Sequence, residues 1–294
     1  MAENDRLAEE FEQNRGHLRG VAYRMLGSLS DADDAVQEAW LKLSRSDAGK
    51  VENLGGWLTT VVARVCLDML RARKARREDS FDAAVVEPAA HGARPSDPER
   101  EALLADSVGL ALLVVLETLD PAERLAFVLH DMFAVPFDEI AGIVGRSPEA
   151  ARQLASRARR RVQGSAAVEH GELARQREVV DAFIAALRAG DFDGLIAVLD
   201  PDVVVTADEG VVAAGGAREV RGAQAWAKGA IAAARGARFA RPALVNGSVG
   251  VVVAPQGRLF RVLSFTFKDG RISRLEVIGD RSRLEQLELG VLDN

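Results

Sequence analysis

Apolar residues recur at helical spacing through the first part of the chain. The longest stripe lies in a helix expected from Trp57 to about Arg77, where apolar residues fall three or four positions apart: Leu58, Val62, Val65 and Met69. Shorter helices are expected from about Leu7 to Leu26 and, after a break at Ser28-Leu-Ser30, from Asp31 to Leu43. Together the three helices predict an all-α first domain over residues 1–79.

Helical periodicity stops after Ser80. The stretch from Val86 to Pro98 contains three prolines and a glycine, which predicts a linker over residues 80–99. Periodicity then resumes in helices expected from Leu103 to Leu119 and from Pro121 to Phe133. With the two helices that follow, these predict a four-helix second domain over residues 100–168.

The stretch from Phe137 to Val162 predicts a helix-turn-helix. Gly145 is expected to end the first helix, and Ser147-Pro148 is a typical start for the second. The second helix is strongly basic, and its apolar residues form only a narrow seam: Ala151, Leu154, Ala155, Ala158 and Val162. Such a helix packs through its seam and offers its other faces to phosphates.

The last third of the chain, residues 172–294, combines helices with β-type alternation. A helix is expected from Glu172 to Ala189, and after a turn at Gly190-Asp191 a shorter helix is expected to end at Leu199. A third helix is expected from Ala223 to about Ala234. Five runs predict strands: Val203 to Thr206, Arg241 to Val245, Val249 to Ala254, Leu259 to Phe267 and Ile272 to Ile278. Pro255-Gln256-Gly257 and Lys268-Asp269-Gly270 lie between the later runs, and Asp-Gly favours a hairpin. We predict an α+β cone, a curved antiparallel sheet wrapped on helices around a pocket.

Composition narrows the class of protein. The net charge of -6 argues against a chain coated in nucleic acid, but the basic residues cluster in the Trp57–Arg77 helix and in the second helix of the helix-turn-helix. A single cysteine, Cys66, and four scattered histidines predict no disulfide, no metal site and no cofactor. The acidic N-terminus and the absence of long apolar runs predict a cytoplasmic protein without a membrane segment.

Three stretches in register resemble the extracytoplasmic-function group of bacterial RNA polymerase sigma factors, in particular members with a SnoaL/NTF2-like C-terminal extension. Asp31 to Leu43 and Trp57 to Arg73 are similar to region 2 of that family, and Phe137 to Arg161 is similar to region 4. The resemblance covers essentially the whole chain. It implies two all-α sigma domains followed by an α+β SnoaL/NTF2-like cone.

The resemblance also implies partners and contact residues. Core RNA polymerase would be bound through its clamp coiled coil and flap, with the clamp facing Asp34, Gln37, Glu38 and Leu41. The -10 promoter element would meet Arg64, Arg71, Arg73, Lys74, Arg76 and Arg77. The -35 element would receive the second helix of the helix-turn-helix, with base edges near Glu149, Arg152 and Gln153 and phosphates near Arg157, Arg159 and Arg160.

The chain departs from the family pattern in four places, one of which is the linker, where only Val86-Glu87-Pro88 matches a Trp-Leu-Pro-Glu-Pro-like motif. Val65 stands where many relatives have an asparagine. The loop beginning Asp208-Glu209-Gly210 replaces an Asp-Gly-Gly-Gly-Lys-like motif, and the segment from Asp280 to Leu284 replaces an Asn-Pro-Asp-Lys-Leu-like motif. These two segments are expected to form the regulatory contact of the C-terminal domain, and their divergence predicts an altered contact.

Other functions compete with this interpretation. A stand-alone helix-turn-helix transcription factor, with a ligand-sensing or enzymatic C-terminal domain, would share the same basic helix. Asp208 and Glu209 are general acid/base candidates, but no histidine follows His170, so we predict no enzyme activity. A regulatory domain that binds a small apolar ligand in its pocket fits the pattern better.

Overall fold

The computed structural model describes residues 2–45, 53–79, 109–164, 169–212, 218–232 and 234–292. The predicted linker at 80–99 and the start of the helix predicted from Leu103 lie outside the described residues. The chain divides into two compact units, Met1–Val108 with Leu119–Arg159, and Gly109–Thr118 with Arg160–Asn294. Each unit is described by itself.

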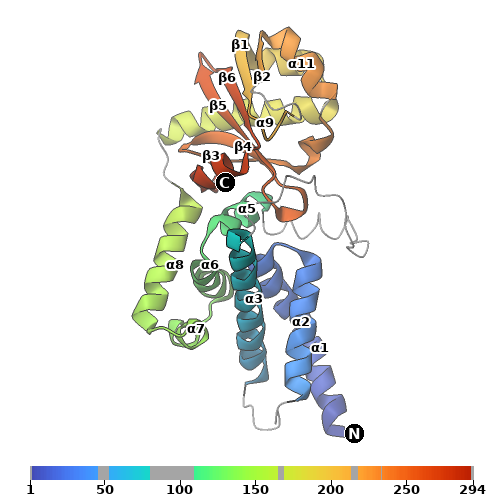
Figure 1. Ribbon diagram of the computed structural model, residues 1–294, viewed down its shortest axis with the longest axis vertical. Coiled ribbons are helices and arrows are strands. Elements are labelled where there is room, and N and C mark those ends of the chain that lie inside the picture. The colour runs from blue at the N-terminus through green and yellow to red at the C-terminus, as the bar shows by residue number, and fades with distance from the viewer. Residues whose placement is uncertain are drawn as a thin grey trace. The chain divides into compact units, whose positions relative to one another are not determined.

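Three helices of the first unit pack side by side: α1 (Ala2–Leu26), α2 (Leu29–Ser44) and α3 (Leu54–Asp79) (Figure 1). The Ser28 side chain caps α2 by accepting a hydrogen bond from the Asp31 amide. The predicted start of α3 at Trp57 is wrong by three residues. Asn53 Oδ1 accepts a hydrogen bond from the Gly56 amide at 3.0 Å, so the two glycines lie within the first turn.

The predicted apolar stripe of α3 forms part of the helical core. Leu58 and Val62 are fully buried, and Val65 and Met69 are mostly covered. Cys66 is also fully buried, and loss of solvation raises the pKa of its thiol to about 12. The thiol is therefore a packed side chain of the core and not a nucleophile.

The second helical group contains α6 (Pro121–Phe127), a π-helix η2 (Val128–Met132), α7 (Phe137–Val144) and α8 (Pro148–Gln163). The single helix predicted from Pro121 to Phe133 is confirmed, because η2 continues α6 without a break and only the hydrogen-bond spacing changes from α to π. Gly145 ends α7 in the left-handed conformation with φ 69°, and Ser147 Oγ accepts a hydrogen bond from the Ala150 amide at 3.2 Å. The helix-turn-helix is confirmed, and every residue of the predicted apolar seam of α8 is buried.

The second unit contains a seven-stranded sheet of order β2-β1-β6-β5-β4-β3-β7. Its strands are β1 (Leu199–Ala207), β2 (Arg218–Arg221), β3 (Ala240–Val245), β4 (Ser248–Val253), β5 (Arg261–Lys268), β6 (Arg271–Ile278) and β7 (Leu289–Gly290). The sheet is antiparallel except that β1 pairs with β6 in parallel. The prediction of a wholly antiparallel sheet is wrong at this pair.

Five described α-helices of this unit accompany the sheet: α5 (Leu110–Thr118), α9 (His170–Ala189), α10 (Phe192–Val198), α11 (Ala223–Ala232) and α12 (Arg281–Gln286). Helix α9 packs on β3 and β4, and α11 packs on β1 (Figure 1). Phe183 of α9 lies 5.8 Å from Trp226 and 5.3 Å from Phe265, measured between ring centroids. The α+β cone is confirmed, and these aromatic rings form part of its core.

Two tight turns set the register of the meander. Asp269 and Gly270 have φ values of 50° and 74°, which confirms the predicted hairpin between β5 and β6. Asn246 and Gly247, with φ values of 50° and 83°, make a second turn between β3 and β4. In both turns the left-handed conformation suits asparagine, aspartate or glycine.

The described helices include none with the length and apolarity needed to cross a membrane. The described residues also contain no group of three or more metal-ligating side chains that could hold an ion.

Candidate nucleic-acid interface

Helix α8 presents a continuous polar face. Because its seam of small apolar residues packs inward, the other side chains project to solvent, and all of the predicted contact residues are exposed: Glu149, Arg152, Gln153, Arg157, Arg159 and Arg160. Glu149, Arg152 and Gln153 lie in the first two turns, and the three other arginines lie toward the C-terminal end. The N-terminal half of such a helix is the part that reaches base edges in a major groove.

Arg152 is held in place near the start of α8. Its Nη1 atom lies 3.2 Å from Glu149 Oε1, and its guanidinium carbon lies 5.6 Å from the centroid of the Phe137 ring. Both interactions contribute little energy at an exposed site, so they orient the side chain but leave it available to contact a base.

Two arginines of α8 bind carboxylates of the preceding helices. Arg157 Nε donates to Glu123 Oε1 at 2.9 Å, and Arg159 donates through Nε and Nη2 to Asp131 Oδ1 at 2.9 and 2.5 Å. The Glu123 side chain is only 8% exposed, whereas that of Arg157 is 47% exposed. Arginine has five N–H donors, so each guanidinium keeps donors for a phosphate.

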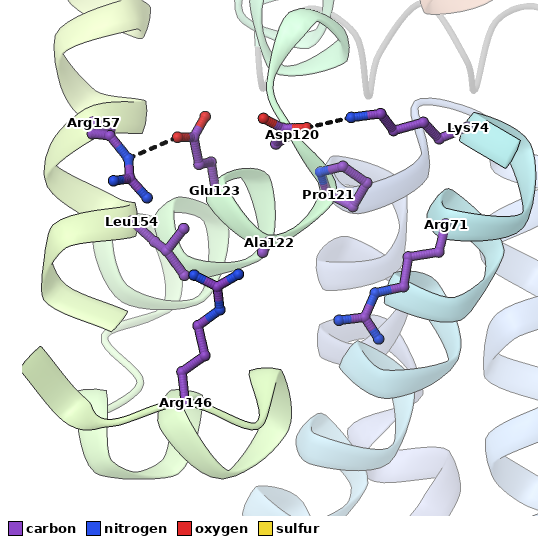
Figure 2. Close-up of a pocket in the computed structure, with 9 residues that line it drawn as sticks. All are labelled: Arg71, Lys74, Asp120, Pro121, Ala122, Glu123, Arg146, Leu154 and Arg157. Carbon is purple, nitrogen blue, oxygen red and sulfur yellow. Dashed lines mark hydrogen bonds and ion pairs between the residues drawn. The ribbon is translucent and has the colours of Figure 1, made fainter. Parts of the chain in front are cut away.

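The predicted basic residues of α3 separate into two groups. Arg64, Arg71, Lys74 and Arg76 are exposed. Arg64 donates to the Gly142 carbonyl at 3.4 Å, and Lys74 pairs with Asp120 at 2.6 Å (Figure 2). The side chain of Arg77 lies outside the described part of the chain.

Arg73 points inward. Its Nη2 atom lies 2.5 Å from Asp31 Oδ2, and its Nη1 atom donates to the Leu26 carbonyl at 3.2 Å. The side chain is 21% exposed. This guanidinium links α3 to the junction between α1 and α2, which the sequence pattern did not indicate.

Helix α2 presents an acidic face to solvent. Asp34, Gln37, Glu38 and Leu41 are all exposed and follow the i, i+3, i+4, i+7 spacing of one helical face. Leu41 is 39% exposed and is one of two large exposed apolar side chains among the described residues. An apolar residue surrounded by acidic and amide groups suits a protein partner.

In the C-terminal unit, Asp208 joins the two segments predicted to be regulatory. Its Oδ1 atom accepts hydrogen bonds from the amides of Gly279 and Asp280 at 2.9 and 3.1 Å and from that of Gly210 at 3.2 Å. Its Oδ2 atom lies 3.4 Å from Arg283 Nη1. The two segments therefore form one junction within this unit.

The junction requires small residues and leaves two predicted residues, Glu209 and Gly210, exposed. A Cβ atom at Gly279 would lie 2.9 Å from the Gly210 carbonyl oxygen, closer than ordinary contact. Arg283 Nη2 donates to Glu276 Oε1 at 2.6 Å, and this hydrogen bond raises the pKa of Arg283. Glu209 is exposed, whereas Leu284 is buried.

The sequence interpretation missed the carboxylates that hold the basic residues. Asp120, Glu123 and Asp131 were not predicted to hold these cations, yet each contacts a predicted DNA-binding residue. Which cation each carboxylate contacts could not be inferred from the sequence, because the contact depends on how α6 and η2 pack against α3 and α8. Acidic residues on helices flanking a basic helix were the available signal.

Comparisons with known proteins agree on the class. Sigma-70 region 2 matches residues 11–76, and Sigma-70 region 4 matches residues 109–162. The chain is 40% identical over 285 residues to the ECF RNA polymerase sigma factor SigJ of Mycobacterium tuberculosis, covering 90% of this chain and 89% of that protein. It is 36% identical over 295 residues to the probable ECF RNA polymerase sigma factor SigI of the same species, covering 99% of both. The crystal structure of M. tuberculosis SigJ matches with 35% identity and a TM-score of 0.46, covering 94% of this chain and 98% of that one.

Replacing Asp208 with alanine is expected to destabilise the C-terminal unit. The change removes the acceptor of three backbone amides, and lost hydrogen bonds of this kind cost about 1–3 kcal/mol. Thermal unfolding of the full chain, followed by circular dichroism, measures the effect. Glu209→Ala changes the neighbouring exposed carboxylate and serves as the control. Equal melting temperatures for the two variants would show that the junction contributes nothing to stability.

Proposed function

The chain belongs to the extracytoplasmic-function RNA polymerase sigma factors, and on this premise we propose how its surfaces bind polymerase and promoter. It is an alternative sigma factor that joins core RNA polymerase and initiates transcription at promoters with -10 and -35 elements. The observation that carries the detailed proposal is the exposed basic and amide face of α8, built on a capped helix-turn-helix. We assign no chemical reaction to the chain itself, and we place its action in the cytoplasm with the polymerase.

Helix α8 enters the major groove of the -35 element in this proposal. Arg152 pairs best with guanine, Gln153 with adenine, and Glu149 with the amino group of cytosine. Arg157, Arg159 and Arg160 lie farther along the helix, where they meet phosphates and position the helix. The short seam supports this placement because it leaves most of the helix surface free for the groove.

Helix α3 contacts the -10 element through its exposed cations. Arg64, Arg71, Lys74 and Arg76 form a local basic surface on a chain whose net charge is -6. Phosphate contacts by such residues bring affinity that falls with salt but carry little sequence information. Arg73 is assigned a structural part in this contact because Asp31 already binds its guanidinium.

Helix α2 binds the polymerase. The exposed face containing Asp34, Gln37, Glu38 and Leu41 docks on the clamp coiled coil of the largest subunit, and the second helical domain meets the flap. Leu41 provides the apolar contact, and the charged residues around it orient the docking.

The C-terminal unit regulates promoter recognition by holding both ends of the region 4 segment. Helix α5 (Leu110–Thr118), the first helix of that segment, packs on β3 and β7, and the Leu259 amide donates to Glu117 Oε2 at 3.2 Å. At the other end, the Val291 amide donates to the carbonyl of Val162, in the last turn of α8, at 2.7 Å. Gly164 packs closely against Gly290.

These contacts make a point substitution a cleaner test than truncation. Deleting the C-terminal domain would uncover the buried side chains of α5, including Leu113 and Leu116, and would disturb region 4 directly. The junction around Asp208 stabilises the rest of the unit. Binding of a small apolar ligand in that unit remains a prediction.

Transcription by core RNA polymerase with this chain added tests the proposal. The double substitution Arg152→Ala and Gln153→Ala is expected to reduce run-off transcript by about tenfold or more, because each base contact contributes about 1–3 kcal/mol. Arg175→Ala, on α9, removes another exposed arginine and should leave transcription unchanged. The absence of transcript from every genomic promoter fragment with the unmodified chain would contradict the proposal.

Substituting Val291 with proline tests the hold on α8. Proline lacks the amide that donates to Val162, whereas Val291→Ala keeps it. We expect transcription with Val291→Pro to depend less on the -35 sequence, because α8 is less well positioned. Mutating the -35 element should therefore lower transcription by a smaller factor than with the unmodified chain. Amide hydrogen exchange in the last turn of α8 should also be faster. Glu117→Ala should act in the same direction from α5. If Val291→Pro and Val291→Ala behave alike in both measurements, the C-terminal unit does not position α8.

A further inference from the structure

A cavity of about 370 Å³ lies in the first unit beside the basic helices (Figure 2). Helix α3, the start of α6, the turn of the helix-turn-helix and α8 all contribute to its lining. The lining residues are Arg71, Lys74, Asp120, Pro121, Ala122, Glu123, Arg146, Leu154 and Arg157. Its volume is at the lower end of the range of about 300–1,000 Å³ that is usual for small-molecule sites.

The charges of this cavity are unbalanced. Four cations and two carboxylates line it, and each carboxylate already has a cation: Asp120 Oδ1 lies 2.6 Å from Lys74 Nζ, and Glu123 Oε1 lies 2.9 Å from Arg157 Nε. Arg71 and Arg146 are the remaining charges. The ion pair of Arg71 with Asp68 is 3.9 Å long and exposed, and no ion pair of Arg146 is found among the described residues.

The positions of these two arginines suit a single anion. Figure 2 shows the Arg146 side chain extending from the turn toward Ala122 and Leu154, and the Arg71 side chain extending from α3 into the space beside it. Two guanidinium groups beside one cavity repel each other, and an anion bound between them offsets this repulsion. Phosphate oxygens fit guanidinium donors in the bidentate geometry that gives the strongest hydrogen bonds.

We propose that this cavity binds a small polyphosphate anion, with Arg71 and Arg146 as its principal ligands and Lys74 and Arg157 at its edge. The anion needs several negative charges, because Asp120 and Glu123 lie beside the site and repel it. A singly charged anion would gain too little attraction from the arginines to offset that repulsion. Pro121, Ala122 and Leu154 give the cavity an apolar side against which a nucleoside could rest.

Occupancy of the cavity would oppose promoter binding, a consequence that rests on the proposed function. Arg71 and Lys74 belong to the helix assigned to the -10 element, and Arg157 belongs to the helix assigned to the -35 element. One polyphosphate would engage cations from both helices. DNA phosphates and the polyphosphate then compete for the same side chains.

Isothermal titration calorimetry of the full chain with inorganic tripolyphosphate tests the site without DNA or polymerase. Arg146→Gln is expected to weaken binding about tenfold or more, because it removes a charge-assisted bidentate contact. Arg175→Gln, which alters an exposed arginine of α9, is the matched control and should bind as the unmodified chain does. Sulfate at equal ionic strength should not compete. Equal affinity in the two variants, or no measurable binding to the unmodified chain, overturns the proposal.

Two further arms separate the source of the anion and its effect. ATP that binds more tightly than tripolyphosphate, with the same dependence on Arg146, indicates a nucleotide, and the reverse order indicates a free polyphosphate; either order supports the site. Binding of holoenzyme to a promoter fragment, without nucleotides, should weaken when tripolyphosphate is added and should weaken less in Arg146→Gln. Promoter binding that tripolyphosphate leaves unchanged, with both the unmodified chain and Arg146→Gln, overturns the competition. A holoenzyme that never binds the promoter contradicts only the proposed function.

Discussion

Ion pairs between the basic helices and the chain's own carboxylates set the positions of the cations in the helical unit. The Glu123 side chain is only 8% exposed, and the half-exposed Arg157 donates to its carboxylate at 2.9 Å, so replacing Arg157 removes a donor from a mostly buried charge. Asp31 holds Arg73 in a similar way. The Lys74–Asp120 pair is exposed on both sides and contributes little, about 0–1 kcal/mol. The same pairs therefore fix the helices and determine which cations remain available to an external phosphate.

The recognition helix combines a small inner seam with attachment at its end. Three of the five seam residues are alanines, which allow close packing but bury little apolar area each. Ion pairs with Glu123 and Asp131 supplement that packing from the side. The hydrogen bond from Val291 adds a third attachment in the last turn. A helix held in this way has an orientation that depends on residues distant from it in sequence, and this is the route by which we propose that the C-terminal unit influences promoter recognition.

Local patterns predicted the features that depend on neighbouring residues. The buried seam of α8, the cap at Ser147 and the Asp269-Gly270 hairpin all follow from spacing and turn chemistry, and all are present. The start of α3 was wrong because Asn53 caps a first turn that contains two glycines, and the Asn246-Gly247 turn was an available signal that was overlooked. The parallel β1–β6 pair, the inward Arg73 and the Val291–Val162 hydrogen bond join residues far apart in sequence, so no local pattern could indicate them. Of the site, exposure on α2 and α8 was predictable, whereas the carboxylate partners were not.

The central claim is that two helices of one chain, α3 and α8, read two promoter elements only as part of the polymerase. Permanganate and DNase I footprinting of a promoter fragment measures this directly, with the chain alone and with core RNA polymerase added. The account predicts protection at both elements and reactive, unpaired thymines at the -10 element only when the core enzyme is present. Protection of a single segment by the chain alone, with no reactive thymines after the core enzyme is added, would contradict it and would indicate a stand-alone helix-turn-helix factor.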